Sequence, residues 1–275
     1  MRRIESHHVA ADGTRLFRRA WQPATPHHAV VLVHGYAEHT GRYDATGSAF
    51  AAAGYAVESF DLRGHGRSQG ERCHVDGFDR YLDDLDAVLA FSRDTYHGLP
   101  IHLLGHSMGS LIVLTHLTER NPVVSSAVVS APPLELRVAR LQRVLGQVLQ
   151  RVWPTFRMEM DLGADGLSRD PEVVRRYQED PLVGSGMTAS LAAEMSRKVV
   201  STAAVASAVD VPLLALHGNA DPICPSTATQ AFMDAVSSTG SRYLEYSDLR
   251  HEILNEPEQD QVRRDILAWW KELSE

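Results

Sequence analysis

A serine flanked by two glycines lies near the middle of the chain, in Gly105-His106-Ser107-Met108-Gly109. An apolar run, Ile101 to Leu104, precedes it, and apolar residues at helical spacing follow it. A strand that turns sharply into a helix lifts such a serine hydroxyl clear of the sheet, provided that small residues let strand and helix approach closely. The pattern therefore predicts that Ser107 is a nucleophile, with Gly105 and Gly109 supplying the space at the elbow.

A serine hydroxyl is a weak nucleophile at neutral pH, so it needs a histidine base and an acid that orients the base. In hydrolases built on this elbow the chain order is serine, acid, histidine. Val211 to His217 is typical of a buried strand, and the turn after it carries Asp221. Among the 14 histidines only His251 follows Asp221. The order predicts a triad of Ser107, Asp221 and His251.

Other acids compete for the second position of this triad. Asp210 precedes the strand and so lies at the wrong end of the sheet, whereas Asp248 lies only three residues before His251. We expect Asp221 to be the acid, with Asp248 as the main alternative. Asp221 also suits a turn in which the carboxylate accepts hydrogen bonds from its own backbone, and it can serve both purposes.

Acyl transfer also requires two backbone N–H groups that stabilise the developing oxyanion. Met108, directly after the nucleophile, supplies one of them. The second is expected in the loop His34-Gly35-Tyr36, which follows the strand candidate Ala29 to Val33. The backbone of Tyr36 is the expected donor, and its ring is expected to form an aromatic wall of the substrate pocket.

With these motifs in place, the chain resembles the bacterial monoacylglycerol lipases and lysophospholipases among the serine aminopeptidase-type α/β-hydrolases. The resemblance implies the same five roles for Ser107, Asp221, His251, Tyr36 and Met108. Two departures are Ser110, where glycine is usual, and Tyr36, where a small residue is common. The matching blocks are HGYAEH at 34–39, FDLRGHGRS at 60–68, GHSMGS at 105–110, LSRDPEVVRRYQEDPLV at 167–183, HGNADPICP at 217–225 and HEILNEPE at 251–258.

The composition is typical of a globular enzyme. The chain has 275 residues, of which 44% are hydrophobic and 23% are charged, which is enough for one large core. A formal net charge of -8 argues against a nucleic-acid partner. Cys73 and Cys224 have no CxxC spacing, so neither a zinc site nor a disulfide framework is suggested. The expected serine chemistry implies no metal or organic cofactor. The N-terminus lacks an apolar signal segment, so we expect a cytoplasmic protein. Peripheral contact with a membrane is compatible with this expectation.

Strand-like and helix-like patterns alternate along the chain, which predicts a mostly parallel central sheet with helices on both faces, the α/β-hydrolase fold. Helices are expected near 43–53, 78–96, 108–120, 225–237 and 257–273. The expected strands are Thr14 to Trp21, Ala29 to Val33, Ala56 to Phe60, Ile101 to Leu104, Ala127 to Ser130, Val211 to His217 and Arg242 to Tyr246.

The alternation breaks at residues 132–205, which we interpret as a helical cap, or lid, inserted into a core of residues 1–131 and 206–275. Two interpretations of its first helix stay open: the apolar face packs over Ser107 and lines an acyl tunnel, or part of it touches a membrane or micelle. The apolar face comprises Leu134, Val138, Leu141, Leu145, Val148, Val152 and Trp153, with Arg137, Arg140, Arg143 and Arg151 largely opposite.

These features predict hydrolysis of a carboxylic ester with one acyl chain, best exemplified by monoacylglycerol. Alternatives are a general short-chain carboxylesterase, a lysophospholipase, or a non-catalytic sensor that kept the pocket. Besides Tyr36, we expect Cys224 and cap residues near Leu141 and Leu145 to contact substrate. The oligomeric state is left open. The histidine pairs His7-His8 and His27-His28 are expected to be solvated.

Overall fold

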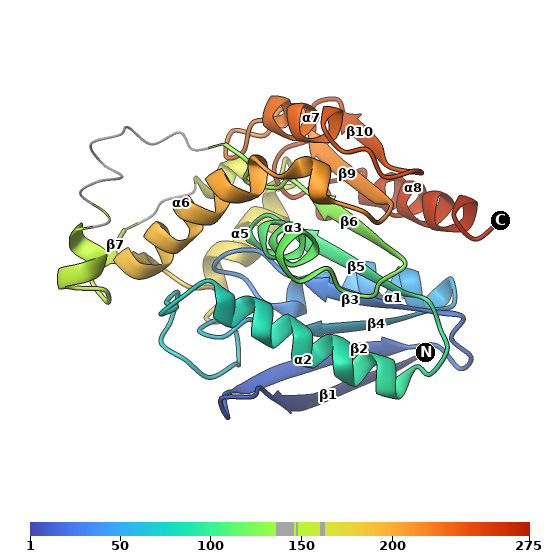
Figure 1. Ribbon diagram of the computed structural model, residues 1–275, viewed down its shortest axis with the longest axis horizontal. Coiled ribbons are helices and arrows are strands. Elements are labelled where there is room, and N and C mark those ends of the chain that lie inside the picture. Colours follow the sequence, from blue (N-terminus) through green and yellow to red (C-terminus); the bar gives the residue numbers. More distant parts are fainter. Residues whose placement is uncertain (136–145, 147, 160–162) are drawn as a thin grey trace.

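A twisted eight-stranded sheet runs through the molecule in the order β1-β2-β4-β3-β5-β6-β9-β10 (Figure 1). The structure is a computed structural model that describes residues 1–135, 146, 148–159 and 163–275. Both pairings of β2, with β1 and with β4, are antiparallel, and the other pairings are parallel. The strands are β1 (Arg2–Val9), β2 (Arg15–Gln22), β3 (His28–Val33), β4 (Tyr55–Phe60), β5 (Ile101–His106), β6 (Ser126–Ser130), β9 (Leu213–Gly218) and β10 (Arg242–Tyr246).

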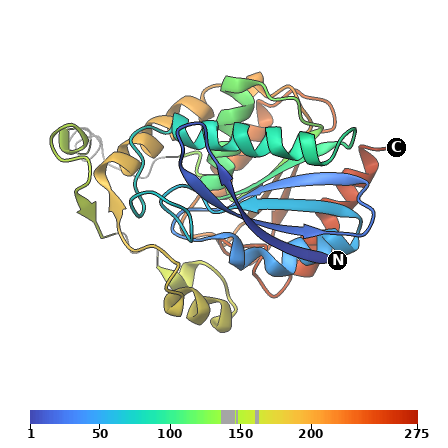
Figure 2. The same ribbon diagram turned by 90° about the horizontal axis from the view of Figure 1, so that it is seen from below.

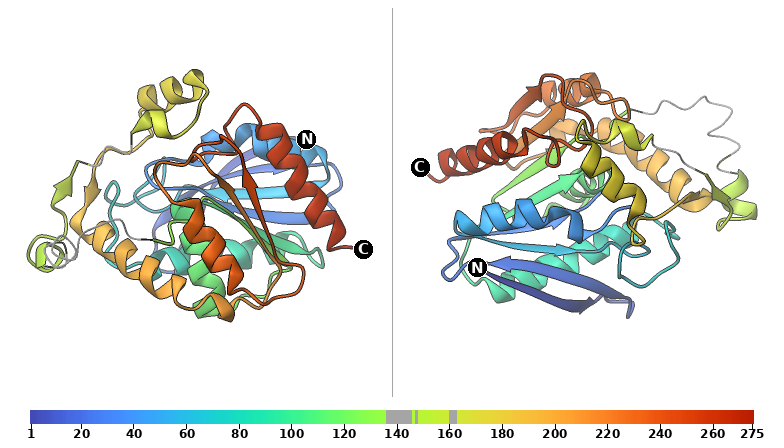
Figure 3. Two further views of the ribbon diagram at one scale, coloured as in Figure 1. Left: turned by 90° about the horizontal axis from the view of Figure 1, so that it is seen from above. Right: turned by 180° about the vertical axis from the view of Figure 1, so that it is seen from behind.

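The central strands are apolar on both sides because helices cover both faces of the sheet. Trp21 of β2, Phe50 of α1 (Asp44–Ala52) and Trp270 of α8 (Gln259–Glu272) belong to the core on one face. Figure 3 shows α1 and α8 side by side on that face. The core on the other face is formed by α2 (Asp79–Thr95), α3 (Met108–Arg120) and α7 (Ser226–Asp234). The expected α/β-hydrolase fold is confirmed.

Between β6 and β9 the chain leaves the sheet and builds a separate group of elements beside the core (Figure 2). Helix α6 (Ala189–Ala203) returns to the core, where its Thr202 and Thr115 of α3 share a hydrogen bond of 2.9 Å. The described elements of this insertion are β7 (Arg157–Met158), the 3₁₀ turn η2 (Ala164–Gly166), α5 (Pro171–Glu179), β8 (Met187–Thr188), α6 (Ala189–Ala203) and the 3₁₀ turn η3 (Ala206–Ala208).

The apolar face predicted for the first helix of the insertion is only partly described. Val138, Leu141 and Leu145 lie outside the described residues, as do Arg137, Arg140 and Arg143. Leu134 is buried, whereas the side chains at the other end of the stretch, Val148, Val152 and Trp153, are exposed. Within the described residues, no helix is both long and apolar enough to span a membrane.

The N-terminal strand β1 is not among the strands expected from the sequence. The prediction that His8, in this strand, is solvated is wrong. His8 is buried, and its ring packs edge-on against Phe91 at 4.5 Å, so it is not solvated. Burial lowers the pKa of His8 to about 4. His28, which is also expected to be solvated, is half-buried and shares a hydrogen bond of 3.1 Å with His102. The segment RRIESHHV carries too few apolar residues to be recognised as a strand from the sequence. It becomes a strand through its pairing with β2.

Candidate active site

Ser107 occupies the turn between β5 and α3 with φ 50° and ψ −119°. Positive φ strains a residue that has a Cβ, and such strain is typical of functional turns. The neighbouring glycines make the turn sterically feasible. A Cβ on Gly105 would lie 2.6 Å from the carbonyl oxygen of Gly109, and one on Gly109 would lie 2.1 Å from that of Val33. The elbow therefore tolerates no side chain at either position.

The structure brings Asp221 and His251 together, although they lie 30 residues apart in the chain. Asp221 follows the end of β9, and His251 lies in the loop between β10 and α8. The distance between Asp221 Oδ2 and His251 Nδ1 is 2.7 Å. Asp248, the alternative acid, is exposed. Asp221 also serves as a turn residue, because its Oδ1 accepts hydrogen bonds from the backbone N–H groups of Ile223 at 2.7 Å and Cys224 at 3.0 Å.

The electrostatics of this pair favour an ionised acid and a basic histidine. Burial tends to raise the pKa of Asp221, but the neighbouring His251 and the hydrogen bonds from His217, His251 and Cys224 lower it well below its usual range. Burial tends to lower the pKa of His251, yet the charge and hydrogen bond of Asp221 raise it overall. A general base with a carboxylate at Nδ1 leaves Nε2 as the nitrogen that takes a proton.

Ser107, His251 and the loop after β3 converge at one edge of the sheet. The rings of His106, which precedes Ser107, and His251 are centred 5.0 Å apart. A Cβ on Gly35 would lie 3.2 Å from the Cβ of Ser107, so the loop runs directly against the serine. Strands β3, β5, β6 and β9 are consecutive and parallel in the sheet, and their carboxyl ends therefore lie at the same edge.

The loop after β3 is held by Glu38, a buried carboxylate that the sequence analysis did not single out. Glu38 accepts a hydrogen bond from the backbone N–H of Gly35 at 2.5 Å and another from the hydroxyl of Tyr43 at 2.6 Å. Among the described residues, the backbone N–H groups of Tyr36 and Met108 have no acceptor. These are the two donors that the sequence predicts for the oxyanion.

Arg42 links Glu38 to Glu252, the residue after His251. Its guanidinium binds Glu252 with two hydrogen bonds of 2.5 and 2.7 Å and Glu38 with one of 3.0 Å. Arg42 outweighs the effect of burial on Glu252 and lowers its pKa to about 2, whereas burial raises the pKa of Glu38. The ring of Tyr177, from α5, lies 4.8 Å from the guanidinium carbon of Arg42. The charged cluster therefore also contacts the insertion.

Two further contacts join the insertion to the same loop. The backbone N–H of Gly184 donates to the carbonyl of Ala37 at 2.9 Å, and His39 Nε2 lies 2.9 Å from Asp180 Oδ2. The insertion is thus attached to the loop that carries the candidate oxyanion donor.

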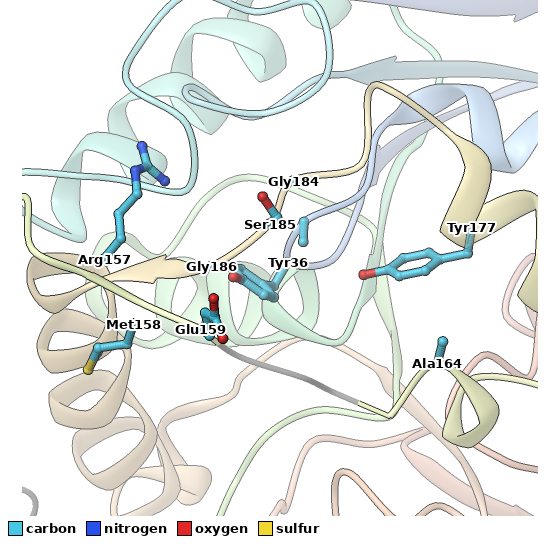
Figure 4. Close-up of a pocket in the computed structure, with 10 residues that line it drawn as sticks. Tyr36, Arg157, Met158, Glu159, Ala164, Tyr177, Gly184, Ser185 and Gly186 are labelled. Carbon is cyan, nitrogen blue, oxygen red and sulfur yellow. The ribbon is translucent and has the colours of Figure 1, made fainter.

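A cavity of about 570 Å³ lies between the loop and the insertion. Figure 4 shows the ring of Tyr36 in the middle of this cavity, between Tyr177 on one side and Arg157 on the other. The other lining residues are Ala37, Met158, Glu159, Ala164, Gly184, Ser185 and Gly186. Tyr36 therefore lines a cavity, and its predicted role as a wall of the substrate pocket stays a prediction.

Cys224 is not among the residues that line this cavity, but it lies beside the triad. Potential ligand atoms of Asp221, Cys224 and His251 lie within 4.8 Å of one another, and all three residues are buried. The three types of side chain can ligate a metal, but His251 Nδ1 and Asp221 Oδ2 here bind each other. That hydrogen bond is the arrangement of a base and its orienting acid.

Comparison with known proteins agrees with this geometry. Residues 24–258 match the family described as serine aminopeptidase, S33. The chain belongs to this family. A monoacylglycerol lipase from Mycolicibacterium smegmatis is 36% identical over 271 residues, which cover 97% of this chain and 96% of that protein. The phospholipase YtpA of Bacillus subtilis is 29% identical over 246 residues, which cover 88% of this chain and 94% of that protein.

A solved structure of a monoacylglycerol lipase agrees with this comparison. The monoacylglycerol lipase of Paleococcus ferrophilus superposes with a TM-score of 0.84 at 30% identity, covering 92% of this chain and 97% of that one. Family membership, named relatives and fold together make this chain a serine ester hydrolase.

Proposed function

We propose that this serine ester hydrolase cleaves monoacylglycerol to a fatty acid and glycerol through an acyl-enzyme on Ser107. The observation that carries the proposal is the strained Ser107 elbow next to the hydrogen-bonded pair of His251 and the ionised Asp221. The similarity to the monoacylglycerol lipases of Mycolicibacterium smegmatis and Paleococcus ferrophilus supports the choice of ester.

In the proposed reaction, Ser107 Oγ attacks the ester carbonyl while His251 Nε2 takes its proton. The tetrahedral intermediate then expels glycerol, which leaves with the proton from His251, and the acyl group stays on Ser107. Water attacks this acyl-enzyme with His251 again as base, and the fatty acid departs as Ser107 recovers its proton. No metal or organic cofactor takes part in these steps.

The backbone N–H groups of Tyr36 and Met108 are proposed to stabilise the oxyanion in both steps. Their availability supports this role. Among the described residues, the N–H of Tyr36 has no acceptor, whereas the N–H of the neighbouring Gly35 binds Glu38. Preorganised donors of this kind are each worth roughly 3 kcal/mol of transition-state stabilisation.

Residues 132–205 are proposed to act as a cap that shapes the substrate pocket. The cavity beside Tyr36 supports this role, since most of its lining residues come from the insertion. Tyr36 and Cys224 are proposed to contact substrate, as are the residues near Leu141 and Leu145, which lie outside the described part of the chain. We further propose a cytoplasmic enzyme that meets its lipid substrate at a membrane or micelle surface.

The exposed apolar side chains of the cap support contact with such a surface. Val148, Val152, Trp153 and Phe156 lie within nine residues of one another and are 36–79% exposed. Exposed aromatic and aliphatic side chains that lie together are typical of lipid or protein contact surfaces. Arg151 and Arg157 in the same stretch would suit anionic head groups.

A substrate panel tests the proposal. Monoacylglycerols, diacylglycerols, lysophosphatidylcholine and soluble short-chain esters are compared by kcat/KM, and we expect the long-chain monoacylglycerols to rank first. If activity on lysophosphatidylcholine ranked first, the enzyme would be a lysophospholipase. This is the second candidate, because the chain is similar to the phospholipase YtpA and Arg157 lines the cavity. A burst of acylation without turnover on every ester would indicate a sensor.

A further inference from the structure

A second histidine binds the same carboxylate oxygen that orients His251. His217 is in β9, four residues before Asp221, and is fully buried. Its Nε2 lies 3.0 Å from Asp221 Oδ2, the atom that lies 2.7 Å from His251 Nδ1. From the sequence alone, His217 is expected only to end a buried strand. Two imidazole rings therefore share one carboxylate oxygen.

The surroundings of His217 determine which ring nitrogen carries the proton. Nε2 lies within hydrogen-bond distance of two acceptors, Asp221 Oδ2 and the carbonyl oxygen of Cys224 at 3.2 Å. Neither acceptor has a proton to donate, so Nε2 must be protonated. Nδ1 lies 2.8 Å from the hydroxyl oxygen of Thr229, which donates to it in the neutral ring. His217 is thus an N–H donor to Asp221.

With this donor, the carboxylate of Asp221 has its full set of partners. Oδ1 accepts from two backbone N–H groups, and Oδ2 accepts from two imidazole N–H groups. An ionised carboxylate has about four lone-pair positions, so all of them are used. Removing one donor leaves the charge more concentrated on Oδ2, where His251 binds.

We propose that His217 is a positioning residue that holds the Asp221 carboxylate and, by sharing its negative charge, sets the pH range in which His251 acts as a base. The inference rests on the proposed function, in which Asp221 orients His251. Without His217, Asp221 holds the imidazolium form of His251 more strongly, and the acidic limb of the rate profile moves to higher pH.

Other charged or titratable groups also face His251. Glu252 and Glu38 raise its pKa through their charge, and Arg42 between them opposes this effect by neutralising both. The ring of His106 and the thiol of Cys224 lie beside it. Among the described residues, Glu252, Glu38, Arg42 and His106 have no hydrogen bond to His217, so a change at His217 leaves their contacts in place, whereas Cys224 binds His217 through its carbonyl oxygen.

Three variants separate this role from a purely structural one. His217→Leu removes the donor, and we expect kcat/KM to fall roughly tenfold and the acidic limb to rise by about half a pH unit. His217→Gln keeps an N–H donor at a similar distance from the backbone, and we expect it to return the limb close to its original position. Thr229→Val perturbs the same buried site without touching Asp221, and should lower Tm while leaving the limb unchanged.

An NMR measurement on the unmodified enzyme does not depend on whether a variant folds. The ¹⁵N shifts of the His217 ring should show the proton on Nε2, and a proton on Nδ1 alone would overturn the proposal. So would an acidic limb that stays in place in His217→Leu, or one that moves equally in Thr229→Val. Full esterase activity in Ser107→Ala would instead reject the proposed function and leave the tautomer result standing.

Discussion

Ser107 combines a strained backbone with little packing, so its removal tests the chemistry alone. We expect Ser107→Ala to retain less than about a thousandth of the esterase activity, because loss of a triad nucleophile costs on the order of a million-fold. The Tm should change little. A fluorophosphonate probe should label the parent enzyme at Ser107 and leave the variant unlabelled; labelling of the variant would move the nucleophile elsewhere.

Asp221 and Asp248 can be separated by matched amide substitutions. Asp221→Asn should lower kcat by roughly 10⁴-fold, because His251 loses both its tautomer and the charge that stabilises its imidazolium form. Asp248→Asn should stay close to the parent, since Asp248 is exposed. Steady-state kinetics on a soluble ester give both values, and a reversed ranking would assign the acid to Asp248.

Cys224 lies close enough to the triad for a bulky group on its thiol to block substrate. Maleimide treatment should inhibit the enzyme, and Cys224→Ala should remain active and resist the reagent. Cys73→Ala is the matched control and should stay sensitive, because Cys73 is more deeply buried than Cys224, at 0% against 6% exposure, and burial raises the pKa of the Cys73 thiol, which disfavours the reactive thiolate. Mass spectrometry identifies the modified thiol, and full activity after complete modification of Cys224 would contradict the prediction.

Glu252 contributes to stability through Arg42, and the sign of its pKa shift defines the pH range. The folded-state pKa of about 2 lies below the ordinary value of 4.5, so this contribution is complete above pH 4.5 and is lost as the pH falls towards 2. Glu252→Gln should cost about 3–5 kcal/mol in urea unfolding at pH 7, because it leaves Arg42 partly unpaired in a buried site.

An exposed ion pair provides the control for Glu252. Glu272 binds Arg242 at 2.8 Å on the surface, where both side chains are about half exposed. Glu272→Gln should therefore cost less than about 1 kcal/mol. The Glu252 variant should also move the acidic limb of activity to lower pH, since a negative charge near His251 is lost. Equal unfolding free energies for the two variants would refute this account.

At the level of elements, we expect the stretch around 148–156 to decide how the proposed cap meets lipid. Replacing Val152 and Trp153 with serine should raise KM for micellar monoacylglycerol several-fold and leave KM for a soluble short-chain ester unchanged, because the apolar surface of each exposed side chain is stabilising only when it enters an apolar phase. The side chains are 79% and 57% exposed, so Tm should not fall.

Val123 lies outside the insertion and is 85% exposed, so it is the matched control for this experiment. Val123→Ser should leave both KM values unchanged. If the double variant loses both activities in parallel and unfolds at a lower temperature, the two side chains belong to the packed interior of the cap. The related prediction for Leu141 and Leu145 concerns residues outside the described part of the chain.

At the level of the whole molecule, the site depends on the parallel order of the strands. Gly35, Ser107 and Asp221 each follow a strand whose carboxyl end lies at the same edge of the sheet, and His251 follows β10 at that edge. Parallel strands need crossover connections on the sheet faces, so their following loops collect at one edge. The insertion leaves the sheet after β6 and also returns contacts to this edge.

The sequence by itself determined the features that depend on local pattern. Apolar runs bounded by turn residues predict the buried strands, and Gly105 and Gly109 around Ser107 predict the elbow because their small size matters within a few residues. The chain order further narrows the base to His251. These inferences need no knowledge of which strands become neighbours.

Only the tertiary structure decided contacts between segments that are distant in the chain. It placed Asp221 rather than Asp248 against His251, added His217 to the same carboxylate, and joined Glu38 to the loop that carries the proposed oxyanion donor. It also buried His8, whose strand looks polar in isolation. The physical reason is that a hydrogen bond forms or fails over a few tenths of an ångström, and that distance follows from strand order and packing rather than from residue type.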